Sequence, residues 1–291
     1  MTHPRRSLLF MPGSNSRALE KARVLPADCI ILDIEDSVAP DSKGLARDQI
    51  AKALAAGGFG KREVWIRTNA LDTPHWADDV KMAAKAKPHA ILVPKVSTVD
   101  DIKTISAALR DANGDPSIRL WTMIETALGV LRAEEMAAAS RNEPRLAGFA
   151  FGPNDISRET RIRMQPGRAI MLPMFIQSIL AARAYGLEIL DGPYSDFSNI
   201  EGFSEECTQS RDLGFDGKTL IHPSQIEACN AIFTPPAEEV ERARKIIAAF
   251  QLPENAARGA ISMDGQMVER LHAEMAKRTI AIADSIAAMG H

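Results

Sequence analysis

Carboxylates collect where apolar segments of this sequence end. They are Asp33, Glu35 and Asp36 in CIILDIED, Glu125 in IRLWTMIE, and Asp155 after LAGFAFGPN. Arg67 ends another apolar segment, REVWIRTN. Like charges that share one site repel one another unless a cation offsets them. Two carboxylates with open positions for water or substrate oxygens are what Mg²⁺ takes. The pattern therefore predicts a hard divalent metal and an anionic, oxygen-rich substrate.

Each of these side chains also has a structural interpretation. Asp155 could cap a helix, Glu125 could pair with a nearby lysine, and Arg67 could be a buried partner of the acids around Asp33. The coincidence of positions favours chemistry, because Glu125 and Asp155 end adjacent segments and Arg67 lies two segments from Glu125. No histidines are paired as in a transition-metal site. Further polar residues at segment ends are Lys95, Asp191 and His222.

The elements that must position these residues recur along the chain. Eight short apolar segments begin at Arg6, Cys29, Arg62, Ala90, Ile118, Leu146, Leu187 and Asp216. They are mostly continuous in apolar residues, as parallel strands buried on both faces require. Amphipathic segments such as residues 75–87 and 98–112 separate them. The pattern predicts an α/β fold, a (β/α)8 barrel whose chemistry lies at the C-terminal ends of the strands. A doubly wound sheet is the alternative.

The repeat stops near residue 234. We expect residues 1–234 to form the barrel with its catalytic mouth, and residues 235–291 to form a C-terminal helical segment that acts as a lid or in oligomerisation. Pro235 and Pro236 open a helix with Glu238 and Glu239 in its first turn, which suits the helix dipole. A linker over 251–267 leads to a last helix over 268–289.

Composition narrows the class of partner. The formal net charge is −3 and no basic block stands out, so nucleic acid is not expected as a partner. The three cysteines have no spacing typical of a zinc site or a disulfide framework. No apolar run approaches the ~18 residues of a membrane span, so we expect no membrane partner. A cytoplasmic location is the expectation.

Seven motifs connect these residues to a known family. They are RSLLFMPGS, ILDIEDSVAPDSK, WIRTN, ILVPKV, MIETALG, FGPNDIS and GFDGKTLIHPSQI, and they cover nearly the whole chain in family order. The chain resembles the citrate lyase beta-subunit-like family, which includes malyl-CoA, methylmalyl-CoA and citramalyl-CoA lyases and malyl-CoA thioesterase. The resemblance implies a (β/α)8 barrel, Mg²⁺ (with Mn²⁺ as a substitute), an acyl-CoA substrate, a small 2-oxoacid, and a homo-oligomer, usually a trimer.

The resemblance also implies roles for individual residues. Glu125 and Asp155 match the two metal ligands, and Arg67 matches the arginine that holds the substrate. Asp33, Glu35 and Asp36 match the acidic cluster around that arginine and the metal waters. Ser14, Arg17 and Lys21 fall where relatives bind CoA, and two cations beside a helix N-terminus attract phosphates independently of any resemblance.

One departure from the family concerns the reaction itself. Many family lyases supply an Asp after GKMVD to a neighbouring subunit, whereas this chain reads GQMVERLH and places Glu269 there. A thioesterase branch also carries Glu. The leading hypothesis is a Mg²⁺-dependent lyase that cleaves a 3-hydroxyacyl-CoA such as malyl-CoA into a 2-oxoacid and an acyl-CoA. A (3S)-malyl-CoA thioesterase using the same site is the alternative, and a non-catalytic CoA-binding subunit is the third.

Overall fold

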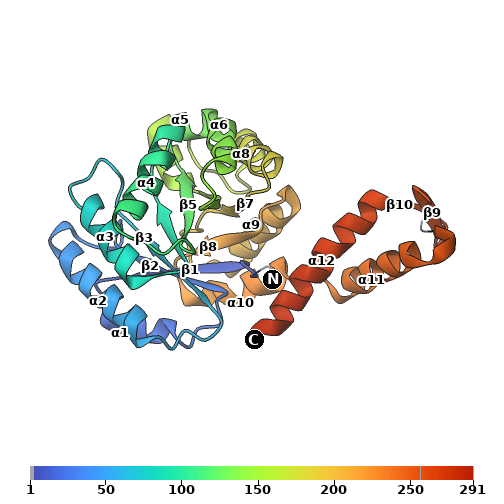
Figure 1. The fold of residues 1–291 in the computed structure, drawn as a ribbon, viewed down its shortest axis with the longest axis horizontal. Helices are drawn as coiled ribbons and strands as arrows, with labels where there is room; N and C mark the ends of the chain where they lie inside the picture. Colours follow the sequence, from blue (N-terminus) through green and yellow to red (C-terminus); the bar gives the residue numbers. More distant parts are fainter. Residues whose placement is uncertain (1–2, 256, 291) are drawn as a thin grey trace. The chain divides into compact units, whose positions relative to one another are not determined.

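Eight parallel strands close into a barrel in the computed structural model of this chain, which describes residues 3–255 and 257–290 (Figure 1). The strands are β1 (Ser7–Pro12), β2 (Cys29–Asp33), β3 (Glu63–Arg67), β4 (Ala90–Val93), β5 (Arg119–Ile124), β6 (Leu146–Phe151), β7 (Glu188–Asp191) and β8 (Gly217–Leu220). Each strand pairs with the next, and β1 pairs with β8. The predicted (β/α)8 barrel is confirmed, and the closed ring excludes the doubly wound alternative.

Helices follow the strands and lie outside the ring (Figure 1). They are α1 (Ser16–Ala22), α2 (Lys43–Ala56), α3 (Trp76–Ala86), α4 (Val99–Asp111), α5 (Ala127–Leu131), α6 (Ala133–Ala138), α7 (Pro153–Thr160), α8 (Leu172–Ala184), α9 (Ile200–Leu213) and α10 (Ile226–Phe233). Short 3₁₀ helices cover Pro40–Ser42, Ala139–Arg141, Ala169–Met171 and Pro223–Gln225. Local sequence fixes some starts, since Thr98 and Asp101 form a capping box on α4. The described residues contain no helix long and apolar enough to cross a membrane.

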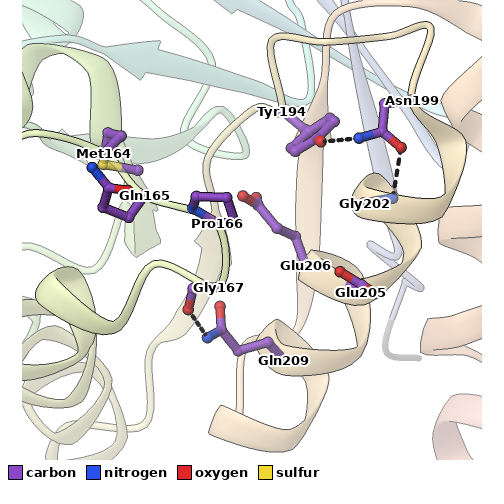
Figure 2. A pocket seen from close by; sticks show the side chains of 10 residues that line it. All are labelled: Met164, Gln165, Pro166, Gly167, Tyr194, Asn199, Gly202, Glu205, Glu206 and Gln209. Carbon is purple, nitrogen blue, oxygen red and sulfur yellow. Dashed lines mark hydrogen bonds between the residues drawn. The ribbon is translucent and has the colours of Figure 1, made fainter.

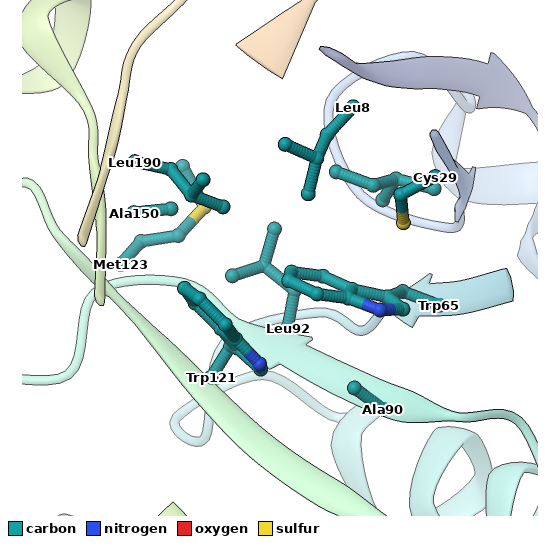
Figure 3. Close-up of a cluster of buried hydrophobic side chains, with 10 residues drawn as sticks. Leu8, Cys29, Trp65, Ala90, Leu92, Trp121, Met123, Ala150 and Leu190 are labelled. Atoms are coloured by element: carbon teal, nitrogen blue, oxygen red, sulfur yellow. The ribbon is translucent and has the colours of Figure 1, made fainter. Parts of the chain in front are cut away.

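The interior of the barrel is a packed core (Figure 3). Buried side chains from β1 to β7 meet there, among them Leu8, Ile31, Leu92, Met123 and Leu190. Trp65 and Trp121 are the largest, with ring centroids 4.6 Å apart. Gly148 on β6 makes room for them, because a Cβ at that position would lie 2.5 Å from the Trp121 ring. The core therefore leaves no open channel through the barrel, in keeping with the layered interior of such folds.

Charged residues seal the N-terminal end of the barrel beneath this core. The guanidinium of Arg5, just before β1, bonds Glu63 at the start of β3 and Glu188 at the start of β7, at distances of 2.7 to 2.9 Å. Its central carbon lies 5.5 Å from the centroid of the Trp121 ring. With this end closed, polar groups can gather only at the opposite end, where the strands terminate.

A buried ionic network joins the barrel wall to α9. Asp191 ends β7, and its carboxylate accepts from Lys218 of β8 at 2.5 Å and from Arg168 at 2.9 Å. Ser210 of α9 also donates to it at 2.5 Å. Burial disfavours the charged form of Asp191, but Lys218 and Arg168 outweigh that effect and lower its pKa to about 2. Asp191, one of the polar residues at predicted segment ends, thus stabilises the barrel wall through these contacts.

The chain divides into two compact units, residues 5–230 and a second one made of the described residues from 231 onward with His3 and Pro4. The second unit contains α11 (Ala237–Gln251), a short 3₁₀ helix (Pro253–Asn255), the antiparallel strands β9 (Ala260–Met263) and β10 (Gln266–Glu269), and α12 (Arg270–Met289). Its own core joins Phe250 of α11, Val268 of β10 and Ala273 of α12. The predicted linker therefore holds a hairpin, which turns at Asp264 and Gly265 with positive φ angles.

We predict that Asp191→Asn lowers the free energy of unfolding by roughly 3 kcal/mol near neutral pH, because Arg168 and Lys218 lose their buried partner. The pKa of Asp191 is lower in the folded chain than in the unfolded one, so its carboxylate stabilises the fold above the unfolded pKa of 3.8. That contribution is lost as pH falls toward about 2. In urea titrations, the difference in free energy of unfolding between wild type and variant should become smaller below about pH 4.

Asp100→Asn is the matched control, because Asp100 pairs with Lys103 on the exposed face of α4. It should change stability by less than about 0.5 kcal/mol. If the difference in free energy of unfolding between wild type and Asp191→Asn stays the same above and below about pH 4, the low pKa of Asp191 is contradicted.

Candidate functional site

The C-terminal ends of four adjacent strands bring charged side chains together. Arg67 is the last residue of β3, and Glu35, Lys95 and Glu125 follow β2, β4 and β5 within two residues. Glu35, Arg67 and Glu125 are buried, whereas the Lys95 side chain is about one-third exposed, at 35%. Sequence analysis placed all four at segment ends but gave Lys95 no role, and we call this group with Asp33 and Asp155 the mouth cluster.

Arg67 is held by a two-bond contact with Asp33 at the end of β2. Its Nε and Nη2 donate to the two carboxylate oxygens at 2.6 and 2.7 Å. The backbone N–H groups of Glu35 and Ser37 also donate to Asp33. Burial opposes charge on Asp33, yet Arg67 holds the pKa of that carboxyl below its usual value. The Phe10 ring of β1 packs 4.4 Å from the guanidinium. Arg67 is thus fixed in place, with one nitrogen left to face the mouth.

That nitrogen, Nη1, lies near the two acids that follow strand β2. It lies 2.9 Å from Glu35 Oε2 and 3.9 Å from Asp36. Glu35 also accepts from Lys95 Nζ at 2.7 Å, so it bridges the two cations. Burial raises the pKa of Glu35 despite both cations. Asp36 is different, since 65% of its side chain is exposed. The predicted acidic group is therefore split into two buried acids and one exposed acid.

Glu125 has the most perturbed carboxyl in the mouth cluster. It accepts the backbone N–H of Lys95 at 2.8 Å. Burial, and then the charges of Glu35 and Asp155, raise its pKa to about 8, and Arg67 and Lys95 do not compensate. A charged Glu125 thus needs more positive charge than the chain supplies. A divalent cation has the charge and the preference for oxygen to supply it.

Gly152, in the FGPN motif, gives Glu125 the space that it occupies. A Cβ at Gly152 would lie 2.5 Å from both Cβ and Oε2 of Glu125. Gly152 is also the N-cap of α7, and Pro153 takes the first helical position. Strand β6 therefore ends beside Glu125, just before Gly152. Helix α7 begins at the residue after Gly152, Pro153.

Asp155 lies in the first turn of α7, and it is not the N-cap residue, since Gly152 is. Its carboxylate pairs with Arg158 at 2.5 Å, and it is close enough to Glu125 to raise the pKa of that group. Within the described residues, no three His, Cys, Asp or Glu side chains form a cluster that could hold a metal. Glu125 and Asp155 would thus provide two ligands and leave the other positions to water or substrate.

The other predicted residues fall outside this cluster. Ser14, Arg17 and Lys21 lie on the turn after β1 and on α1, with Arg17 and Lys21 exposed. Glu269 belongs to the second unit, where it is the N-cap of α12 and accepts the backbone N–H of His272. His222 caps the 3₁₀ helix at Pro223 by accepting the backbone N–H of Ser224.

A cavity of about 480 Å³ lies apart from the mouth cluster residues, between α9 and the loop before Arg168 (Figure 2). Glu205, Glu206 and Gln209 of α9 line it with Tyr194 and Gln165. None of the described residues that line it is a lysine or arginine, so phosphate groups are disfavoured there. The sequence offered no signal for this cavity, because its residues are far apart in the chain and match no motif.

We predict that Gly152→Ala destabilises the chain by about 1–3 kcal/mol, as overpacking of a core does. The new methyl group can be accommodated only if Glu125 moves, because the φ angle of −110° is itself open to alanine. Thermal and urea unfolding measure the loss.

Gly44→Ala is the control for this substitution. The nearest atom to an added Cβ there is 4.0 Å away, in the flexible Arg47 side chain. Stability should stay the same or rise by less than about 1 kcal/mol. Equal behaviour of the two variants would show that Glu125 is not confined by Gly152.

Comparisons with known proteins agree with this arrangement. Residues 6–223 match the family model described as HpcH/HpaI aldolase/citrate lyase. The chain is 45% identical over 288 residues to a (3S)-malyl-CoA thioesterase of Cereibacter sphaeroides, covering 99% of this chain and 98% of the relative. It is 34% identical to the citrate lyase subunit beta of Leuconostoc mesenteroides subsp. cremoris, covering 97% and 94%.

A solved structure adds a likeness in three dimensions. The protein CitE from Mycobacterium tuberculosis, in complex with magnesium, acetoacetate and coenzyme A, matches with a TM-score of 0.75 at 26% identity, covering 96% of this chain and 97% of that one. The resemblance noted in the sequence motifs is confirmed. The chain belongs to the HpcH/HpaI aldolase/citrate lyase family.

Proposed function

We propose that this protein is a Mg²⁺-dependent enzyme that acts on 3-hydroxyacyl-CoA thioesters such as malyl-CoA, and that thioester hydrolysis is its net reaction. The observation that carries the proposal is the buried, charge-deficient Glu125 beside the fixed Arg67. The choice of hydrolysis draws support from the 45% identity with a (3S)-malyl-CoA thioesterase, against 34% with a citrate lyase beta subunit.

Glu125 and Asp155 would hold the Mg²⁺ ion, with Mn²⁺ as a substitute. The donor set fits, because carboxylates with open neighbouring positions suit a hard cation and the raised pKa of Glu125 shows the missing positive charge. When bound, the ion polarises the substrate carbonyl as a Lewis acid. A solved relative that contains magnesium with acetoacetate and coenzyme A supports the choice of this ion.

The chain's own residues would orient the substrate. Arg67 would bind the acyl carboxylate through Nη1, which also pairs with Glu35, while Asp33 keeps the guanidinium plane fixed. Ser14, Arg17 and Lys21 on the segment after β1 would bind the CoA phosphates through cationic and hydroxyl groups. In hydrolysis, water attacks the thioester carbonyl, the C–S bond breaks, and malate and the CoA thiol leave.

Cleavage of the C2–C3 bond is the second candidate function, which the identity with citrate lyase beta subunits favours. A base would take the proton of the 3-hydroxyl group and the C2–C3 bond would break. Glyoxylate would leave, and the resulting acetyl-CoA enolate would take up a proton. Both reactions place negative charge on the thioester oxygen and use the same substrate contacts.

One incubation separates these functions. Protein with malyl-CoA and Mg²⁺ is assayed in parallel for free thiol, malate, glyoxylate and acetyl-CoA, with and without a chelator. Thiol and malate in equal amounts support hydrolysis, whereas glyoxylate and acetyl-CoA support the lyase. If neither pair of products forms from malyl-CoA or from its methylated homologues, both candidate reactions are overturned. The non-catalytic CoA-binding subunit would then be the remaining hypothesis.

Glu125→Gln and Asp155→Asn should each weaken Mg²⁺ binding by about 100-fold. Loss of a residue that only supports a metal ligand already weakens binding by up to about 100-fold. Turnover should fall with it, while thermal stability without metal is kept. Calorimetric titration with Mg²⁺ measures the affinity, and Asp100→Asn serves as control. If Asp155→Asn binds Mg²⁺ normally but loses about 1 kcal/mol of stability, its role is only in the helix terminus.

We also propose that the protein is a homo-oligomer, with a trimer expected from the family resemblance, and that the C-terminal segment of one copy serves the site of another. Glu269 would then accept the proton of the attacking water in a neighbouring copy. Its position as N-cap of α12 is compatible with this role, because a carboxylate that accepts one backbone N–H keeps further lone pairs.

A mixing experiment tests this sharing. Glu269→Gln and Asp155→Asn are each expected to be inactive, and mixed oligomers of the two should regain part of the activity, since some sites then receive both intact residues. Subunit exchange is verified by mass spectrometry of tagged copies. Verified exchange without recovery would exclude a shared site.

A further inference from the structure

Lys95 has a backbone conformation that its side chain does not favour. Its φ angle is +57°, in the left-handed region, which costs a residue other than glycine of order 1 kcal/mol or more. The conformation directs the Lys95 N–H to Glu125 Oε1 at 2.8 Å. The following Ser97 hydroxyl is 2.6 Å from Thr126, so the ends of β4 and β5 are tied together at this point.

A backbone bond alone would not require lysine, because glycine adopts this conformation more readily. The side chain must therefore contribute something of its own. Its Nζ bonds Glu35 at 2.7 Å, which uses one of three N–H donors. Two donors thus remain beyond the Glu35 contact, in a side chain that lies within electrostatic reach of Glu125 and Asp36.

Exposure distinguishes Lys95 from the other cation of the mouth cluster. Of the Lys95 side chain 35% is exposed, against 10% for Arg67, which Asp33, Glu35 and Phe10 enclose. The Lys95 side chain is therefore more open to an incoming anionic oxygen than the Arg67 side chain is. Glu35 forms ion pairs with both cations and accepts a hydrogen bond from Lys95, which holds the ammonium group beside Arg67.

We propose that Lys95 is a substrate-contacting catalytic residue, whose ammonium group stabilises the negative charge that develops on the thioester oxygen. The inference rests on the proposed function and applies to both candidate reactions. In hydrolysis the charge builds as water adds to the carbonyl, and in C2–C3 cleavage it builds as the enolate forms. Lys95 transfers no proton in either case and acts by charge and hydrogen bonding placed in advance.

Three variants separate the side chain from the backbone. Lys95→Met removes the ammonium group, Lys95→Gly also relieves the left-handed strain while keeping the N–H to Glu125, and Lys95→Arg restores a cation. We expect Lys95→Met and Lys95→Gly to lower kcat by about 100- to 1000-fold, as loss of one oxyanion donor does. KM should change by less than about fivefold, because the contact strengthens in the transition state. Arg should recover part of kcat.

Mg²⁺ titration adds a measurement independent of turnover. Lys95→Gly should bind Mg²⁺ within about threefold of wild type, since its backbone still holds Glu125. Lys87 is the matched control, because it is a lysine with a φ angle of +51° at the end of α3, before β4. Lys87→Met should leave kcat unchanged and Lys87→Gly should do the same. Loss of kcat in proportion to loss of Mg²⁺ affinity would show that Lys95 only positions Glu125 and would overturn the proposal.

A binding probe distinguishes this failure from failure of the proposed function. Carboxymethyl-dethia-CoA carries a carboxylate where the enolate oxygen would lie. With Mg²⁺ present, Lys95→Met should bind it at least about tenfold more weakly than wild type, while binding of CoA itself is unchanged. If the wild type turns over malyl-CoA and Lys95→Met has the same kcat, only the proposed role of Lys95 is overturned. A wild type that neither turns over malyl-CoA nor binds the probe overturns the proposed function, and this inference with it.

Discussion

The buried contact between Asp33 and Arg67 is the interaction around which the mouth of this barrel is built. It joins the last residues of β2 and β3, and two parallel hydrogen bonds fix the plane of the guanidinium. Gly13 permits the close approach of β1, because its N–H bonds the Asp33 carbonyl at 2.9 Å, and a Cβ there would lie 2.7 Å from the same oxygen. The motifs MPGS, LDIED and IRTN thus describe one physical junction.

A shortage of positive charge follows from this arrangement. Asp33 takes two nitrogens of Arg67, and Glu35 takes the third nitrogen together with Lys95. Glu125 is then buried and accepts the backbone N–H of Lys95, and its pKa rises to about 8 because burial and the charges of Glu35 and Asp155 outweigh those of Arg67 and Lys95. An enzyme that uses a divalent cation benefits from such a site, since the ion restores neutrality and its oxygen ligands are already placed.

The closed N-terminal end leaves the opposite end of the barrel for the proposed chemistry. Arg5 with its two glutamates and the Trp65–Trp121 pair fill the lower barrel, and the network of Arg168, Asp191 and Lys218 holds the wall against α9. These buried charges are fully paired and make no site. The mouth cluster differs from them, because burial and acidic neighbours raise the pKa of Glu125 despite the cations nearby.

The sequence by itself determined the ring of eight strands and the residues that end them. Parallel strands buried on both faces need continuous apolar runs, and their C-terminal ends must share one side of the barrel, so Arg67 and Glu125 were predictable from order along the chain. Tertiary structure decided how they pair. Lys95 meets Glu35 across 60 positions and Asp191 meets Lys218 across 27, and no local pattern encodes those partners. Residues 251–267 were predicted as a linker, and packing against α11 and α12 is what made strands of the segments on either side of Asp264 and Gly265.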